Sequence, residues 1–134
     1  MRTKADILKE ITDYGFPHKE VVISMDDYFD SENCTEGCFG GNGEPPEKFY
    51  QIFKDLVSTR KADVIFVRIN DADDPEEWFS TDTVYIIGSL SLEEVQANME
   101  LLEPDEIYEE WMYGKPVNVD DIKGGQKVYS VWWD

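Results

Sequence analysis

The fold of this chain is decided by one run of branched and aromatic residues near its middle, Asp63-Val-Ile-Phe-Val-Arg-Ile69. Four consecutive apolar residues between charged flanks are typical of a strand that is partly covered on both faces. Three more segments have the β-branched and aromatic composition of strands, at 21–23, 83–87 and 127–133. We therefore expect a sheet of four strands built around residues 63–69.

Helical periodicity predicts three helices around these strands. Residues 3–14 place apolar side chains at helical spacing and end at Gly15. A second helix begins at the pair Pro45-Pro46, runs to about Arg60 and carries a continuous apolar stripe. The third helix follows the capping-box sequence Ser91-Leu-Glu-Glu94 and stops at Pro104.

Two shorter segments, 24–29 and 107–111, predict single helical turns. Without the first helix, the element order is β-α-β-β-α-β, the split βαβ arrangement of ferredoxin-like domains. The sequence thus predicts one α+β domain over residues 1–134. It has an extra N-terminal helix and a four-stranded antiparallel sheet with its helices on one face.

Composition excludes several classes of partner. The 134 residues include 30 acids and 12 Lys or Arg, which gives a net charge of −18. Apolar residues make up 41% of the chain, which is enough for one hydrophobic core. Such a charge disfavours nucleic acids and anionic membranes, which bind through Lys and Arg. Because the sequence shows neither an apolar run of about 18 residues nor an apolar signal segment, we expect a cytoplasmic protein.

The acids are concentrated in three loops, and no Lys or Arg occurs at 20–47 or 69–114. The ferredoxin-like topology places all three loops at one pole of the domain. Such a pole favours a cationic partner, although the acids would also serve solubility alone. The fifteen acids are Asp26, Asp27, Asp30, Glu32 and Glu36; Asp71, Asp73, Asp74, Glu76 and Glu77; and Glu103, Asp105, Glu106, Glu109 and Glu110.

Aromatic residues accompany two of these loops, and together they predict a surface that binds a basic protein. Aromatic rings among carboxylates suit cation–π contacts and ion pairs with Lys or Arg. Trp132 and Trp133, adjacent on the last strand, must point to opposite faces, so one lies away from the helices. The predicted partner-binding residues are Asp26, Asp27, Asp30, Asp71, Asp73, Asp74, Glu76, Glu77, Trp78, Glu106, Tyr108, Glu109, Glu110 and Trp111.

Catalytic signals are weak, so we expect a non-enzymatic protein with no catalytic residues and no bound cofactor. His18 is the only histidine and lies in a connecting segment. The carboxylates are too numerous for any pair to stand out as acid and base. The glycine-rich loop at 37–43 lacks the lysine and the spacing of a phosphate-binding loop.

Binding of a small molecule or a divalent metal is the alternative function, and an acidic mimic of nucleic acid is a third. Cys34 and Cys38 lack a second zinc half-site, which leaves structural thiols, a redox or metal role and a disulfide open. The stretch Asp71-Ala-Asp-Asp-Pro-Glu76 begins like an EF-hand loop but departs from it at the fifth and sixth positions. We therefore expect no dedicated metal site. A ligand pocket would lie beside the two cysteines and the glycine-rich loop.

Several stretches after residue 20 together resemble an uncharacterised family of small acidic bacterial proteins. The family has no established activity, so the resemblance implies a bacterial protein and transfers no catalytic residue. Size and charge are also similar to those of immunity proteins that neutralise toxins, which makes a bacterial toxin the most concrete basic partner. The matching stretches are Val22-Ile-Ser-Met-Asp-Asp-Tyr-Phe-Asp30, Asp82-Thr-Val-Tyr-Ile86, Leu92-Glu-Glu-Val95, Glu103-Pro-Asp-Glu-Ile-Tyr-Glu-Glu-Trp111 and Ser130-Val-Trp-Trp-Asp134.

Overall fold

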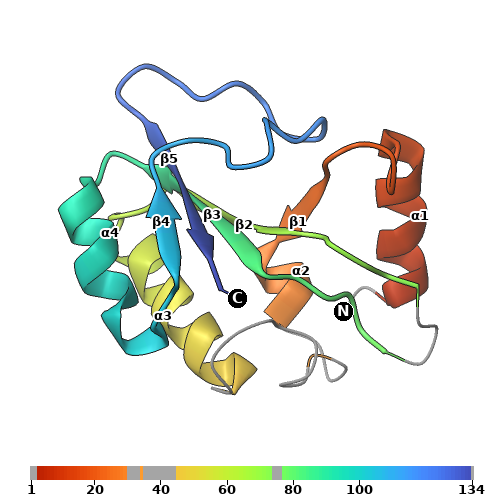
Figure 1. Ribbon diagram of the computed structural model, residues 1–134, viewed down its shortest axis with the longest axis horizontal. Coiled ribbons are helices and arrows are strands. Elements are labelled where there is room, and N and C mark those ends of the chain that lie inside the picture. Colours follow the sequence, from red (N-terminus) through yellow and green to blue (C-terminus); the bar gives the residue numbers. More distant parts are fainter. Residues whose placement is uncertain (1–2, 30–33, 35–44, 74–76, 134) are drawn as a thin grey trace.

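Five antiparallel strands form one sheet in the order β1-β2-β3-β5-β4 (Figure 1). The computed structural model describes residues 3–29, 34, 45–73 and 77–133. The elements are α1 (Lys4–Tyr14), β1 (Val22–Ser24), α2 (Met25–Phe29), α3 (Pro46–Ser58), β2 (Val64–Arg68), β3 (Thr83–Gly88), α4 (Leu92–Met99), the 3-10 turn η2 (Glu100–Leu102), β4 (Glu106–Tyr108) and β5 (Lys127–Trp132).

Local capping residues set where the helices begin. In α1, Thr3 and Asp6 form a reciprocal capping box, and Gly15 ends the helix at φ 116°. The predicted capping box before α4 is also present, between Ser91 and Glu94. The three long helices predicted from periodicity are thus confirmed, with ends shifted by a few residues.

The helices pack against one face of the sheet. Side chains of α1, α2, α3 and α4 share a single core cluster with alternate residues of the strands. Val67, Val84 and Val131 belong to that cluster and lie in register across β2, β3 and β5. Figure 1 shows α3 and α4 near one edge of the sheet and α1 near the other. The expectation of an α+β fold with helices on one face is confirmed.

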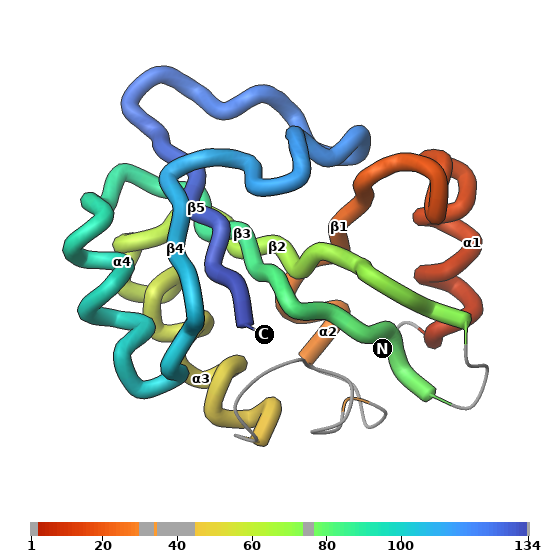
Figure 2. Tube along the Cα trace, in the orientation of Figure 1, coloured from red at the N-terminus to blue at the C-terminus, as the bar shows by residue number. Residues whose placement is uncertain are grey.

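The opposite face, which we call the open face, is covered only in part. A second, smaller cluster there joins Tyr85 and Val128 of the sheet to Val119. Val119 belongs to the long segment 109–126 between β4 and β5, which crosses this face in Figure 2. The two terminal tryptophans divide as predicted: Trp133 is buried against Phe49, whereas Trp132 on the other side of β5 is only half-buried.

The expectation of four strands is wrong, because β4 forms where a helical turn was predicted. Ile107 packs against the main core, and the Asp105 amide donates to the Trp132 carbonyl at 2.9 Å. Pairing with β5 supplies hydrogen bonds that a single helical turn does not, so tertiary contacts override the local signal.

The sheet order also differs from the ferredoxin-like order. A split βαβ unit makes the first two strands parallel, with another strand between them. Here β1 and β2 are direct antiparallel neighbours, with Ile23 opposite Val67. The chain after β1 therefore comes back to form the strand directly beside it, instead of crossing over to leave room for another strand. The order of helices and strands along the sequence is the same in both cases, so it cannot distinguish them.

The two edges of the sheet differ. At β1, the side-chain amide of Asn118 donates to the Val22 carbonyl at 2.7 Å and accepts from its N–H at 3.1 Å. This side chain takes the place of a neighbouring strand. At the other edge, no strand in the described part of the chain lies beyond β4. The sheet is thus capped at β1 and open at β4.

Candidate functional site

The predicted partner-binding residues do not gather at one pole. Because β1 and β2 are antiparallel, the loops that follow them leave from opposite ends of the sheet. The single pole depended on these strands being parallel, so that expectation is wrong. Five of the fifteen acids lie outside the described residues: Asp30, Glu32, Glu36, Asp74 and Glu76.

The described acids of the first loop lie on the helix side of the sheet. Asp26 is exposed and accepts a hydrogen bond of 2.5 Å from the Tyr50 hydroxyl of α3. The backbone amide of Asp27 donates to the Ser24 hydroxyl at 3.1 Å, as the capping-box spacing predicted. Both acids are placed by contacts that hold α2 in position.

The second acidic loop joins β2 to β3 and is held by a lysine of α1. Lys4 Nζ donates to the carbonyl oxygens of Ala72 and Glu77, at 3.2 and 2.7 Å. The Asp71 carboxylate accepts from the Asp73 amide at 2.8 Å. The exposed acids Asp71, Asp73 and Glu77 thus lie beside α1, away from the third acidic loop.

Trp78 is not available to a partner, contrary to the prediction. Its side chain is 3% exposed, and its indole N–H donates to the Tyr28 carbonyl at 3.0 Å. In return, the Tyr28 hydroxyl donates to the carbonyl of Phe79 at 2.9 Å. An aromatic residue in an acidic loop is here a core residue that closes the loop onto α2.

The third acidic loop, in contrast, supplies a contiguous surface at the open edge. Glu106, Tyr108, Glu109, Glu110 and Trp111 follow one another along β4 and the start of segment 109–126, and all are exposed or half-buried. These five are the predicted site residues that the structure brings together.

Glu106 and Tyr108 point to the open face of the sheet. They pair with Trp132 and Ser130 of β5, so Tyr108 and Trp132 are diagonal neighbours across the two strands. The Tyr108 hydroxyl donates to the Glu106 carboxylate. This hydrogen bond is the main cause that raises the pKa of Tyr108.

A buried serine fixes the turn that follows β4. Ser130 Oγ donates to the Glu110 carbonyl at 2.5 Å and accepts from the Met112 amide at 3.0 Å. The Glu109 carboxylate lies 3.4 Å from Lys127 Nζ and accepts a 3.3 Å hydrogen bond from the Tyr129 hydroxyl. Side chains of β5 therefore position both the edge strand and the residues after it.

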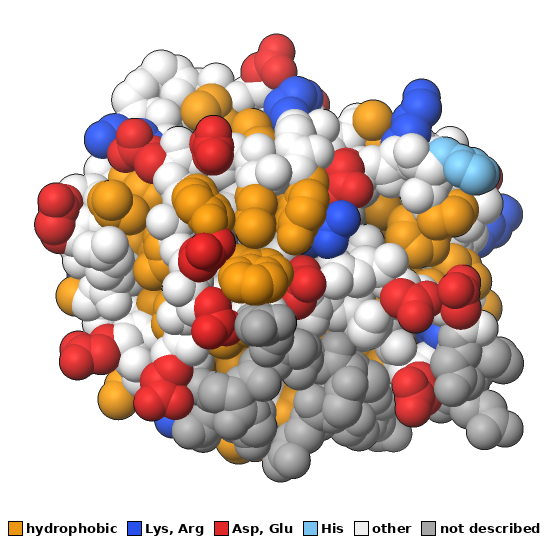
Figure 3. All heavy atoms as spheres, in the orientation of Figure 1, with side chains coloured by type: hydrophobic (Ala, Val, Ile, Leu, Met, Phe, Trp, Pro, Cys, Tyr) orange, Lys and Arg blue, Asp and Glu red, His pale blue; other side chains and the backbone are white. Residues whose placement is uncertain are grey.

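Aromatic rings and charges meet on the open face around Trp132. The guanidinium of Arg68 stacks on the exposed ring of Tyr113, 3.7 Å from its centroid. We call Arg68, Glu106, Tyr108, Tyr113 and Trp132 the open-face cluster. Figure 3 shows hydrophobic side chains gathered on this face over β5 and the segment after β4, with Asp and Glu side chains around them.

Arg68 is neutralised within the chain. Its Nε lies 2.5 Å from one oxygen of Glu20, and its second terminal nitrogen donates to the other at 3.2 Å. Asp82 lies 3.9 Å away. Burial works to lower the pKa of Arg68, but the hydrogen bond and charge of Glu20 together raise it. The cation therefore serves to hold Tyr113 and leaves the acids of the edge in excess.

Tyr85 supports this cluster from below. It is fully buried and packs edge-to-face against Trp111, with ring centroids 4.9 Å apart. Its hydroxyl has no hydrogen-bond partner among the described residues. Burial is the main cause that raises the pKa of Tyr85 well above its ordinary value, and the nearby charge of Arg68 works in the opposite direction.

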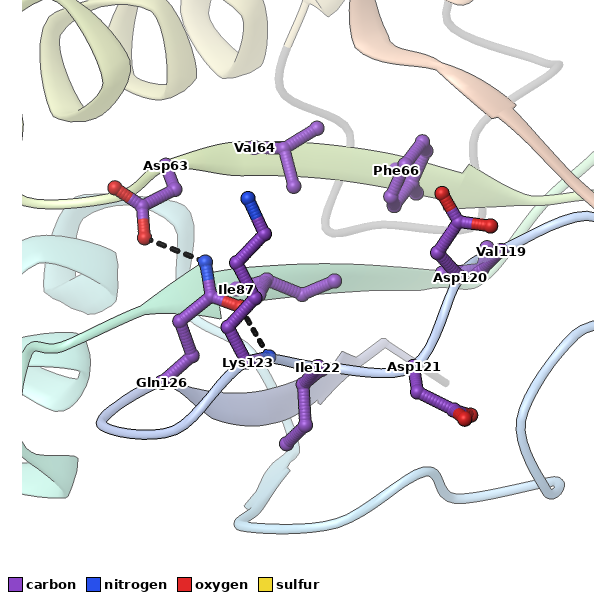
Figure 4. A pocket seen from close by; sticks show the side chains of 10 residues that line it. All are labelled: Asp63, Val64, Phe66, Ile87, Val119, Asp120, Asp121, Ile122, Lys123 and Gln126. Carbon is purple, nitrogen blue, oxygen red and sulfur yellow. Dashed lines mark hydrogen bonds between the residues drawn. The ribbon is translucent and has the colours of Figure 1, made fainter.

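A separate pocket of about 300 Å³ lies on the open face beside the start of β2. Its floor is apolar, and its rim comes from the second half of segment 109–126 (Figure 4). The residues lining it are Asp63, Val64, Phe66, Ile87, Val119, Asp120, Asp121, Ile122, Lys123 and Gln126. The pocket expected beside the cysteines cannot be compared with it, because Cys38 and residues 37–43 lie outside the described residues.

Comparison with known proteins assigns a family. Residues 2–131 match the model of the Uncharacterized protein YfbO family. The chain belongs to the YfbO family. It is 27% identical over 117 residues to "Uncharacterized protein YfbO" of Escherichia coli (strain K12), which covers 84% of this chain and 82% of that protein. No solved structure matches the chain. The predicted resemblance to an uncharacterised bacterial family is confirmed.

Three members of the open-face cluster of this YfbO-family chain were missing from the predicted site. The sequence predicts that one of Trp132 and Trp133 lies away from the helices, and it does not single out Arg68 or Tyr113. Strict alternation along β2 places Arg68 on the same face as Phe66, a signal that was present in the sequence. The contact with Tyr113 depends on the path of segment 109–126, for which no local pattern exists.

The described part of the YfbO-family chain holds no group of three His, Cys, Asp or Glu residues able to bind a metal ion. Within the same residues, no helix is long and apolar enough to cross a bilayer. Cys34 is buried, and its relation to Cys38 falls outside the described residues.

Proposed function

We propose that the protein is a non-enzymatic binding domain for a basic protein surface. The contact region consists of the open-face cluster and the acids of the β4 edge, Glu109 and Glu110. In its most concrete form the domain neutralises or regulates a bacterial toxin in the cytoplasm by covering the toxin's basic surface.

One observation carries this proposal: aromatic rings and carboxylates lie together beside the open strand. Trp132 of β5 is half-buried. In the strand register it lies between Glu106 of β4 and the buried Thr83 of β3. Tyr113 is 40% exposed on the same face. Partly exposed tryptophan and tyrosine rings on a rigid sheet are common energetic centres of protein interfaces.

Electrostatics select the sign of the partner. No Lys or Arg occurs at 69–114, which includes the whole of β4. Arg68 is already paired with Glu20 and Asp82, so it offers little to an anionic partner. A basic surface would therefore associate quickly and lose affinity as salt rises.

A pull-down from bacterial lysate with matched variants tests the proposal. The site variant Glu106→Gln/Trp132→Ala removes one charge and the central ring of the surface. Its partner control, Glu93→Gln/Leu101→Ala, removes one exposed acid and one exposed apolar side chain from α4 and η2. We expect a protein with a basic surface to be captured by the wild type and the control, and lost with the site variant.

Purified partner then allows affinity to be measured. We expect the site variant to weaken binding by at least about tenfold. Equal capture by both variants, or an affinity unchanged between low and high salt, would contradict the proposal.

A further inference from the structure

We infer that the pocket beside β2 binds a small zwitterion, a molecule whose amine and carboxylate are separated by a short apolar spacer. This inference is independent of the proposed function, because the pocket and the open-face cluster share no residue. It rests on the pocket's shape, on the placement of two opposite charges and on the hydrogen bonds that hold the loop carrying them.

The floor of the pocket is a continuous apolar strip. Val64 and Phe66 come from β2, and Ile87 lies opposite Val64 in β3. Val119 closes one side and packs into the same cluster of the open face. At about 300 Å³ the space is at the lower end of the range for ligand pockets, which suits a small molecule.

Two side chains of opposite charge reach into this space from the 119–126 loop. Figure 4 shows Lys123 and Asp120 both directed toward β2, on either side of the apolar strip. Neither has a hydrogen-bond or ion-pair partner among the described residues. Asp121 and Ile122, between them in sequence, also line the pocket, and Asp121 is ion-paired with Lys115.

The loop that carries these charges is held in place by its own hydrogen bonds. The Gln126 carboxamide accepts from the Lys123 amide and donates to the Asp63 carboxylate, both at 2.8 Å. Gly125 adopts a φ of +86°, which L side chains rarely adopt. The turn at 123–126 therefore ties the backbone of Lys123 to the start of β2 through the Gln126 side chain.

The far end of the loop is also fixed. Lys115 Nζ donates to the Val119 carbonyl at 2.6 Å and lies 3.3 Å from Asp121. Asp120 is thus presented between a buried residue and an ion-paired one. Because both ends of the loop are anchored, the backbone positions of Lys123 and Asp120 are set by the fold.

This arrangement disfavours ligands that carry only one sign of charge. An anion would meet Asp63 and Asp120 as well as the −18 charge of the protein. A simple cation would meet Lys123 at the other end of the apolar strip. A molecule with its carboxylate at Lys123, its amine at Asp120 and methylene groups over Phe66 satisfies both charges and covers the floor.

Binding of 6-aminohexanoate, followed by amide chemical shifts in solution, tests the inference. Hexylamine and hexanoate serve as probes with one charge each. We expect the zwitterion to bind at least about threefold more tightly than either, which is typical of one exposed ion pair. Its shift changes should include the amides of Val64, Ile87 and Lys123.

Three variants assign the charges. Lys123→Met should remove the preference for the zwitterion over hexylamine, and Asp120→Asn should remove its preference over hexanoate. Glu100→Gln, which removes an exposed charge that does not line the pocket, should leave both preferences intact. If hexylamine bound the wild type as tightly as the zwitterion, the inference would be overturned. It would also be overturned if about 20 mM of the zwitterion caused no shift change at these amides, because a ligand site should be occupied well below that concentration.

Discussion

At the scale of single residues, the buried tyrosines differ in whether their hydroxyl groups have a hydrogen-bond partner, and Tyr85 is the exception. Other buried tyrosines satisfy their hydroxyl groups: Tyr129 donates to the Leu90 carbonyl at 2.7 Å, and Tyr28 to that of Phe79. The Tyr85 hydroxyl has no partner among the described residues. A buried polar group in that state costs free energy instead of contributing it.

Tyr85→Phe should therefore leave the free energy of unfolding within about 0.5 kcal/mol of wild type, or raise it. Tyr129→Phe, the matched control, removes a made hydrogen bond and should lower it by about 1 kcal/mol. Urea unfolding monitored by tryptophan fluorescence measures both. Equal losses in the two variants would show that Tyr85 has a partner after all.

The same hydroxyl should make stability depend on alkaline pH. Burial raises the pKa of Tyr85 in the folded chain, so above about pH 10 the unfolded chain loses this proton first. The unfolded state then binds fewer protons, and the free energy of unfolding falls as pH rises. This contribution is fully present below pH 10 and is lost above it.

We expect the wild type to lose about 1 kcal/mol more than Tyr85→Phe between pH 9 and pH 11. Urea unfolding of both proteins at the two pH values gives this difference, and titration of the other groups cancels in it. An unchanged difference would mean that the Tyr85 hydroxyl ionises equally in both states.

Gly88 is required by a close approach of two backbones. A Cβ added there would lie 2.9 Å from the Lys61 carbonyl oxygen and 3.0 Å from the Ala62 Cα. We expect Gly88→Ala to lower the free energy of unfolding by about 2 kcal/mol, because backbone atoms cannot move aside as a flexible side chain would. Gly124→Ala, where a Cβ would meet nothing within 4 Å, should stay within about 0.5 kcal/mol in the same unfolding assay.

At the scale of elements, one serine holds the turn that follows β4. Ser130 Oγ bridges the Glu110 carbonyl and the Met112 amide, and Ser130 is fully buried. Ser130→Ala should lower the free energy of unfolding by about 1–3 kcal/mol, since it leaves two backbone groups without their partner. Hydrogen exchange at the Met112 amide should become faster in this variant.

The exposed Ser89 offers the matched control at the end of the neighbouring strand. Ser89→Ala should change neither stability by more than about 0.5 kcal/mol nor exchange at Met112. If Ser130→Ala lost stability while hydrogen exchange at the Met112 amide stayed unchanged, the serine bridge would not be what holds the residues after β4 in place.

Elements with a strong local signal could be predicted from the sequence, and β4 could not. The caps at Thr3 and Ser91 act within one helical turn, so their effect is visible in a few residues. Ile107 and Tyr108 have no such local determinant, because their strand exists only through pairing with β5. Composition alone therefore marks the acidic edge, and pairing with β5 gives it its geometry.

At the scale of the whole molecule, the charge of −18 acts on folding and on binding in opposite directions. Repulsion among acids destabilises the folded chain, and added salt screens it. We expect the free energy of unfolding to rise by about 1 kcal/mol between ~20 and ~500 mM NaCl. Affinity for a basic partner should fall over the same range.

Urea unfolding across a NaCl series measures the first effect, with Glu93→Gln/Glu100→Gln as its control. This variant removes two exposed acids, so its dependence on salt should be smaller than that of the wild type. Stability that is flat or falling with salt would show that the acids do not repel one another appreciably in the folded chain.

The strand order could not be predicted at this scale. Whether the chain returns beside β1 or crosses over depends on contacts among residues distant in sequence, and the element pattern is the same in both cases. The antiparallel pairing of β1 and β2 sends the first and second acidic loops to opposite ends of the sheet. It left the third loop as the part of the predicted surface that stays together.

The cap that Asn118 places on β1 limits how many chains can assemble through the sheet. Addition of a strand from another molecule needs an exposed edge, and among the strands of the described residues each copy offers β4 alone. Two copies joined through β4 would use both edges and leave none for a third. Growth into a fibril by successive edge pairing would therefore stop at a pair, and the repulsion between two rows of glutamates discourages even that.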